Sequence, residues 1–264
     1  MDYREIVCTT ESGVATIILN RPERMNAYTT LMIEELMDAI NYAWKADDVR
    51  VVVITGAGKG FCSGPDLTTF PPLPDTRPPM ECMADYEEGF HKLILRITAL
   101  DKPIIASING PAVASGLVLA LVCDITIASD RAKFGDGALR FGFVPDEGST
   151  YFLPRAVGLK KALELMFLCE IIDAHEAERI GLVCKVVPDA QLVSATKEMA
   201  GRIAEGPPIA QQLAKRAVYR HLDMDLKSSL EDVILAAQVA NNTEDAAEGV
   251  KAFLEKRPAV FKGK

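Results

Sequence analysis

Residues 103–124, PIIASINGPAVASGLVLALVCD, decide the fold, because two apolar runs flank a row of small residues. The first run, residues 103–108, predicts a buried β-strand. The second run opens with Ala114, Ser115 and Gly116 and predicts a helix whose first turn carries small side chains. Such a turn lets a ligand approach the free N–H groups of the helix N-terminus, which carry partial positive charge. These groups suit a carbonyl oxygen that becomes negative during a reaction, although small residues there also allow close helix packing.

Three further segments, residues 14–19, 49–55 and 124–128, have the continuous apolar character of strands that are covered on both faces, as in parallel sheets. Between these segments, apolar residues recur at helical spacing on two stretches. These residues are Ile33, Met37, Ile40 and Trp44 in the first stretch, and Met83, Phe90, Leu93 and Ile97 in the second. The alternation of strand and helix predicts an α/β core with a layered or spiral arrangement.

The pattern changes near residue 173, beyond which nearly all of the chain is helical in pattern. The predicted helices are residues 174–180, 190–205, 208–221, 228–241 and 243–256. We therefore expect two regions, an α/β core over residues 1–172 and a helical region over residues 173–264. Helices that follow a core often form oligomer contacts, and this is the expected role of the second region.

Composition narrows the class of protein. The chain has 264 residues, of which 49% are hydrophobic and 25% charged, which excludes a disordered chain, a collagen and a coiled coil. The net charge of −8 argues against a nucleic-acid partner.

No two of the six cysteines form a C-x-x-C pair and the three histidines lie far apart, so no metal site is expected. The first ten residues lack the apolar core of a signal peptide, and the longest apolar stretch, residues 117–123, is too short to span a membrane. These features predict a cytoplasmic protein with reduced thiols.

Two more segments carry candidate chemistry. Residues 56–67, GAGKGFCSGPDL, follow a predicted strand and would present backbone N–H groups to a ligand, but they match neither the P-loop nor the dinucleotide fingerprint. Residues 70–79, FPPLPDTRPP, predict a surface loop near that glycine-rich turn. In residues 134–155, Asp146 and Glu147 stand just before an apolar helix, where a carboxylate is either a helix cap or a general base.

Taken together, these segments resemble the crotonase superfamily, also called the enoyl-CoA hydratase/isomerase family. The motifs are most similar to those of one branch of the family, the peroxisomal-type Δ3,Δ2-enoyl-CoA isomerases. The matching pieces are residues 20–27 (NRPERMNA), 60–67 (GFCSGPDL), 102–111 (KPIIASINGP), 123–124, 132–134, 153–155, 177–182, 248–253 and 261–262. The resemblance implies a β/α spiral core, a helical C-terminal region that forms trimers or dimers of trimers, and a coenzyme A thioester as substrate, with no separate cofactor.

The resemblance also implies roles for individual residues. Two backbone N–H groups, from position 65 and from Ser115, would hold the thioester oxygen. Phe261 and Lys262 would approach the coenzyme A moiety, either within the same chain or from a neighbouring subunit. The other residues implied to line this moiety are Arg24, Met25, Ser63, Gly64, Asp66 and Leu67.

Three positions depart from the hydratase pattern of the family. The two hydratase glutamates fall at Val118 and Ala138, and neither side chain can move a proton. Position 65 is proline, which has no N–H to donate. Asp146 matches the catalytic carboxylate of several isomerases of the family, so the resemblance favours an isomerase with Asp146 as the base and Glu147 as the alternative. Three alternatives stay open. The protein is a hydratase, or a hydrolase with Asp146 as the nucleophile, or a protein that binds a CoA thioester without catalysis.

Overall fold

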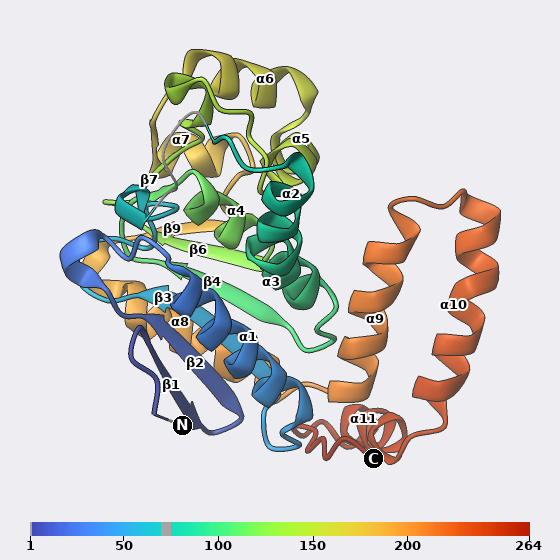
Figure 1. The fold of residues 1–264 in the computed structure, drawn as a ribbon. Coiled ribbons are helices and arrows are strands. Elements are labelled where there is room, and N and C mark those ends of the chain that lie inside the picture. Colours follow the sequence, from blue (N-terminus) through green and yellow to red (C-terminus); the bar gives the residue numbers. More distant parts are fainter. Residues whose placement is uncertain (1, 70–74) are drawn as a thin grey trace.

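The computed structural model describes residues 2–69 and 75–264, and its core is a twisted sheet with helices on both faces (Figure 1). The strand order of the main sheet is β1-β2-β3-β4-β6-β9. These strands are β1 (Ile6–Glu11), β2 (Val14–Leu19), β3 (Val51–Gly56), β4 (Ile104–Ile108), β6 (Ile125–Ser129) and β9 (Lys185–Val187). Apart from the antiparallel pair β1–β2, neighbouring strands run parallel, as the continuous apolar runs predict.

A second, small sheet forms beside the first, with strand order β5-β7-β8. Its strands are β5 (Ala112–Val113), β7 (Lys133–Gly135) and β8 (Ile172–Asp173). The helices are α1 (Thr30–Lys45), α2 (Pro79–Glu88), α3 (Phe90–Thr98), α4 (Ser115–Leu121), α5 (Ser149–Val157), α6 (Leu159–Leu168), α7 (Ala174–Arg179), α8 (Leu192–Ala204), α9 (Pro208–His221), α10 (Leu226–Asn241) and α11 (Glu244–Glu255). Short 3-10 turns, residues 22–24, 67–69, 138–141 and 189–191, join some of them.

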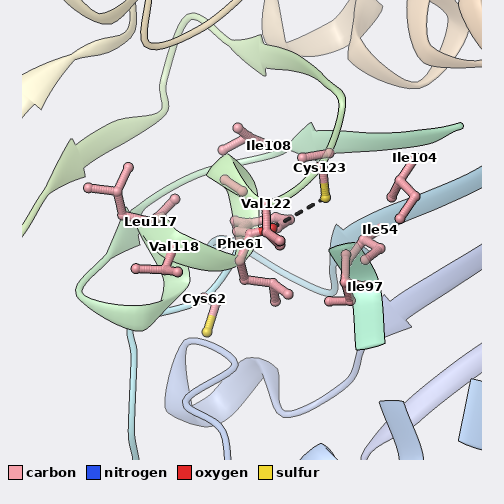
Figure 2. Close-up of a cluster of buried hydrophobic side chains, with 14 of the residues drawn as sticks. Ile54, Phe61, Cys62, Ile97, Ile104, Ile108, Leu117, Val118, Val122 and Cys123 are labelled. Atoms are coloured by element: carbon pink, nitrogen blue, oxygen red, sulfur yellow. Dashed lines mark hydrogen bonds between the residues drawn. The ribbon is translucent and has the colours of Figure 1, made fainter. Parts of the chain in front are cut away.

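Strand β3 shows how the main sheet is buried on both sides. Val52 and Ile54 lie in the larger hydrophobic cluster, which α1, α3 and α4 complete. Val51 and Val53 point the other way, into a smaller cluster that α8 covers. Figure 2 shows the larger cluster around α4, where the Cys123 thiol donates to the carbonyl of Leu119 at 3.3 Å. The fold is thus the expected α/β spiral core.

Most predicted elements are confirmed, and two differences have physical causes. Strand 14–19 and helix 208–221 have the predicted bounds. The helix expected across Met83 and Phe90 is two helices, because the backbone of Gly89 adopts φ −94° and ψ −122° and ends α2. Of the predicted proline-rich loop 70–79, residues 70–74 lie outside the described residues, and Pro79 already begins α2.

The C-terminal third contributes to both the core and an extension. Strand β9 pairs with β6 and α8 packs on the main sheet, although both follow residue 172. Helices α9 and α10 then form a hairpin that projects from the core, with no buried residue on either helix (Figure 1). Lys215 and Arg216 of α9 pair with Asp124 and Asp101, which fixes the hairpin at the sheet.

Candidate functional site

The N-terminus of α4 has the close packing that its small residues predict. Gly116 is required there, because a Cβ atom at this position would lie 2.1 Å from the carbonyl oxygen of Cys62. Ala114 precedes the helix in an unfavourable backbone conformation, with φ 50° and ψ −128°. Ser115 is 2% exposed, and its N–H is one of the helix-terminal groups that have no acceptor inside the helix. The structure therefore presents Ser115 N–H as a donor.

The loop that carries Pro65 lies beside this donor. A Cβ atom added to Gly64, the residue before Pro65, would be 3.6 Å from the Ser115 nitrogen. Tyr28 N–H donates to the Gly64 carbonyl, and Asp66 N–H donates to the Tyr28 carbonyl, both at 2.9 Å. Pro65 has no N–H, and the next N–H along the chain is already used. Of the two oxyanion donors that the resemblance implies, only the one at Ser115 is present.

A cavity of about 30 Å³ opens beside Ser115. Its lining residues are Ala114, Ser115, Val118, Asp136, Ala138, Pro145, Asp146, Glu147 and Ser149. Val118 and Ala138, the two positions that hold glutamates in the family's hydratases, thus face the same small space. Three carboxyl-bearing residues line this cavity together with two apolar side chains at those positions.

Glu147 is the more enclosed of the two neighbouring carboxylates. The Tyr28 hydroxyl donates a hydrogen bond to it. Burial raises the pKa of Glu147 to about 7, the nearby charges of Asp146 and Asp136 act in the same direction, and the hydrogen bond from Tyr28 acts against them. A carboxylate with a pKa near neutrality can both take up and release a proton.

Asp146 lies at the edge of the same cavity with an exposed side chain. Its backbone carbonyl is 2.9 Å from Nε2 of His91 on α3. Burial, and then the charge of Asp146, raise the pKa of Tyr86 on α2 to about 12, so this tyrosine faces Asp146. The two adjacent carboxylates therefore occupy different environments, one enclosed by Tyr28 and the other open to solvent.

Ser149 and Asp136 complete the polar lining. Ser149 is the first residue of α5 and is 2% exposed, yet its hydroxyl has no hydrogen-bond partner in the part of the chain that the structure describes. A buried hydroxyl without a protein partner is rare, and Ser149 also lines the cavity. Asp136 is also buried, and its Oδ1 accepts a hydrogen bond of 3.1 Å from Ala138 N–H.

The residues implied to line the coenzyme A moiety come together on one side of the site. Ser63 N–H donates to the Met25 carbonyl at 3.1 Å, and the Ser63 hydroxyl donates to the Arg24 carbonyl at 3.4 Å. Asp66 is held by the Thr68 hydroxyl and by Arg21, which lower its pKa to about 2, and Leu67 is exposed. The Asp66 carboxylate is thus already engaged within the chain.

Phe261 and Lys262 do not join this group. Lys262 N–H donates to Asp245 on α11 at 2.6 Å, and the Phe261 carbonyl accepts a bond of 2.9 Å from Arg50. Figure 1 places the C-terminus beside α11, away from α4 and α5. Within one chain these two residues do not approach the cavity, so their expected role depends on a neighbouring copy.

Two residues of the site, Tyr28 and Ser149, are not singled out by the sequence. Tyr28 follows the quoted motif at residues 20–27 directly, and Ser149 follows Gly148, but neither position carries a chemical signal of its own. The contact between Tyr28 and Glu147 spans 119 positions of the chain, so it needs the fold to become visible.

The described part of the chain holds no group of three or more His, Cys, Asp or Glu side chains arranged to bind a metal ion. All six cysteines are free thiols. Among the described residues, no helix has both the length and the apolar character needed to cross a bilayer.

Comparisons with known proteins agree with the geometry. Residues 9–264 match the family model described as enoyl-CoA hydratase/isomerase. The chain is 39% identical to (E)-benzylidenesuccinyl-CoA hydratase of Thauera aromatica, over 95% of this chain and 96% of that one. It is 35% identical to 1,2-epoxyphenylacetyl-CoA isomerase of Escherichia coli, over 98% of each. The crystal structure of enoyl-CoA hydratase from Bacillus anthracis superposes with a TM-score of 0.92 at 33% identity, over 99% of this chain and 100% of that one. Because this family model matches almost its whole length, and because relatives that cover nearly all of it are 35–39% identical, the chain belongs to the enoyl-CoA hydratase/isomerase family of the crotonase superfamily.

Proposed function

We propose that this protein is an enoyl-CoA isomerase that shifts a carbon–carbon double bond of an acyl-CoA thioester, with one carboxylate as the proton carrier. The observation that supports it best is Glu147, an enclosed carboxylate with a pKa near 7, in a cavity where both hydratase positions are apolar. An isomerase needs one base that removes a proton at one carbon and returns it at another. Two glutamates are needed only to activate and position water.

The proposed reaction starts from a 3-enoyl-CoA. The Glu147 carboxylate removes a proton from the carbon between the thioester carbonyl and the double bond, and the electron pair moves onto the thioester oxygen. Ser115 N–H donates to that oxygen and stabilises its negative charge. Glu147 then returns the same proton at the far end of the double bond, and the enolate collapses to the conjugated 2-enoyl-CoA.

The choice between the two carboxylates is the sharpest test. The resemblance favours Asp146 as base, whereas enclosure and pKa favour Glu147. We expect Glu147→Gln to lower kcat for a 3-enoyl-CoA at least about a hundredfold, the usual contribution of a general base. The matched variant Asp146→Asn should stay within about threefold of the wild-type protein. A reversed result would make Asp146 the base.

The same experiment tests the function itself. The conjugated product is followed by its ultraviolet absorbance, and binding of a saturated acyl-CoA is measured by calorimetry. Binding without turnover in the wild-type protein would overturn the isomerase in favour of a CoA-thioester-binding protein. A stable acyl-enzyme adduct on Asp146, detected by mass spectrometry, would instead support the nucleophilic route.

Hydration is the second candidate, and Ser149 is the observation that favours it. The cavity of about 30 Å³ is larger than the roughly 10–15 Å³ that a cavity needs to hold one water molecule. The free Ser149 hydroxyl, Glu147 and Asp136 would give such a water its polar partners. Addition of water to a 2-enoyl-CoA that is lost in Ser149→Ala, while isomerisation of a 3-enoyl-CoA persists, would establish a hydratase. No addition of water by the wild-type protein would remove this candidate.

We also propose that the chain works as a homotrimer or hexamer, assembled through the helical C-terminal region. The exposed apolar side chains of α9, α10 and α11 support an assembly. A neighbouring copy would also offer Phe261 and Lys262 a route to the coenzyme A moiety.

A further inference from the structure

We propose that Tyr28 is a positioning residue for the base, one that fixes the Glu147 carboxyl relative to the loop at residues 64–66. The proposal rests on the proposed function only for the role of Glu147. Tyr28 contacts both parts of the site, the loop through its backbone and the carboxylate through its side chain.

The backbone of Tyr28 is tied to the loop on both sides of Pro65. Tyr28 N–H donates to Gly64 and the Tyr28 carbonyl accepts from Asp66, each at 2.9 Å, and Tyr28 and Pro65 form a parallel β-bridge. Gly64 of this loop lies beside the Ser115 nitrogen, since a Cβ atom added to it would be 3.6 Å away. The position of the Tyr28 Cα atom is therefore set by the same segment that borders the proposed site of the thioester oxygen.

The side chain of Tyr28 is held in one orientation. Its ring stacks on the ring of Phe90, with centroids 4.8 Å apart and planes 25° from parallel. Phe90 is itself buried, as the first residue of α3. The Tyr28 hydroxyl donates to Glu147 and accepts from the Ser115 hydroxyl at 3.5 Å. A rigid ring with its hydroxyl on the carboxylate limits the directions in which Glu147 can point.

The contact also acts on the charge of Glu147. In the described part of the chain, the titratable groups that interact with Glu147 are tyrosine, cysteine and aspartate side chains, and no basic group is among them. They are Tyr28 before α1, Cys62 after β3, Tyr86 on α2, Asp136 after β7 and the neighbouring Asp146. Burial and the acidic neighbours raise the pKa of Glu147, and the Tyr28 hydrogen bond lowers it. Without the phenol hydroxyl, the carboxylate would therefore lose the contact that favours its charged form.

The test is Tyr28→Phe, which keeps the ring stack on Phe90 and removes the hydroxyl. We expect kcat for a 3-enoyl-CoA to fall about tenfold to a hundredfold with KM nearly unchanged, as for a small misplacement of a catalytic group. The acidic limb of the kcat profile should move to higher pH, because the base must lose its proton to act. The matched control is Tyr3→Phe, which removes a phenol that donates to Asp38 outside the cavity and should leave both quantities unchanged.

A double-mutant cycle separates positioning from a general loss of structure. In the Glu147→Gln background, Tyr28→Phe should have almost no further effect on kcat, because its partner is already gone. An equal loss of kcat in both backgrounds, or an unshifted acidic limb in Tyr28→Phe, would overturn the proposal.

A readout without turnover keeps the test independent of the reaction. Protein with carbon-13-labelled glutamate carboxyls is titrated by NMR, and the Glu147 signal is assigned by its absence in Glu147→Gln. Tyr28→Phe should raise the midpoint of this signal, and Tyr3→Phe should leave it in place. A raised midpoint in a protein without isomerase activity would refute the proposed function and keep the Tyr28–Glu147 contact, whereas an unmoved midpoint would refute the contact.

Discussion

Among single residues, Pro65 has the clearest effect on the proposed chemistry. It occupies a position where the backbone nitrogen points away from Tyr28, since Tyr28 bonds to the residues on either side. In the proposed reaction, Ser115 N–H would therefore be the donor to the developing oxyanion, where the family resemblance implies two donors. Loss of one such donor costs about 10²–10³ in rate in other enzymes.

Pro65→Ala should restore an N–H at this position. We expect kcat for a 3-enoyl-CoA to rise about tenfold or more, with a smaller change in KM, because the new donor acts mainly on the charged intermediate. Steady-state kinetics measures both constants. Pro188→Ala, which lies outside the site, is the control, and an unchanged kcat in Pro65→Ala would mean that residue 65 does not face the thioester oxygen.

Glu147 also links the site to stability. Its pKa is raised in the folded protein to about 7 from an ordinary value of 4.5, so the folded state holds the proton more tightly than the unfolded state. The contribution to stability is complete below about pH 4.5 and is lost as the pH rises through 7. The glutamine of Glu147→Gln has no proton to lose in this range. The melting temperature of the variant minus that of the wild-type protein should therefore be larger at pH 8 than at pH 5. Differential scanning calorimetry at the two pH values measures this difference, and a constant difference would contradict the raised pKa.

The sequence indicates a site residue when its role depends on the residue itself or on its neighbours in the chain. It does not indicate a residue whose role depends on a contact with a distant part of the chain. Asp146 and Glu147 stand beside each other in a helix-start segment, so their presence near a ligand is predictable, but their different burial is not. The hydroxyl that donates to Glu147 belongs to Tyr28, which is 119 residues away in the chain. The absence of a donor at Pro65 is, in contrast, a property of the residue itself and is visible in the sequence.

Among the elements, α9 depends on the starts of strands β4 and β6. Asp124 accepts bonds of 2.7 Å from Lys215 and from Ile104 N–H, and of 2.9 Å from the Tyr219 hydroxyl. The Lys215 side chain is only 9% exposed, so its charge has little access to water if Asp124 is removed. The second pair, Arg216 with Asp101, has an arginine that is 59% exposed.

Asp124→Ala should therefore destabilise the protein by about 3 kcal/mol, since it leaves a largely buried ammonium group unpaired. Asp101→Ala should cost about 1 kcal/mol or less, because solvent screens the remaining arginine. Urea denaturation of both variants gives the comparison. Equal losses would show that the burial of Lys215 does not decide the effect.

Helices and strands are likewise predicted accurately where the pattern that decides them is local. Strand 14–19 and helix 208–221 have a clear local pattern and are predicted with their bounds. Strand β1 has an exposed, polar C-terminal half and lacks an apolar pattern, so its pairing with β2 is not predicted. Gly89 interrupts a continuous helical periodicity, and periodicity alone does not predict such a break.

At the scale of the whole molecule, the C-terminal helices leave a large apolar surface uncovered. Phe253 is 83% exposed, and the exposed side chains of Leu226, Leu230, Ile234, Leu235, Val239, Val250 and Leu254 accompany it on α10 and α11. Single exposed apolar residues are common on monomers, whereas larger exposed apolar groups are typical of an interface and support the proposed assembly.

The wild-type protein should therefore elute with a mass about three or six times the 28.7 kDa of one chain in light scattering coupled to size exclusion. Phe253→Asp should shift the population towards smaller species, because a charge at an apolar interface is costly to bury. Val193→Asp on α8 is a control with an exposed apolar residue outside α9–α11. A monomeric wild-type protein would refute the assembly.

The span of chain between Tyr28 and Glu147 has a kinetic consequence. Contacts between distant residues form late in folding, because each must first close a long loop. Helices and the β1–β2 hairpin are local and can form early, whereas the hydrogen bond between Tyr28 and Glu147 requires the intervening strands to be in place. Recovery of activity after dilution from denaturant should lag behind recovery of helical signal. Turnover would then report on completion of the core, and a chain still being synthesised would stay inactive until well past residue 147.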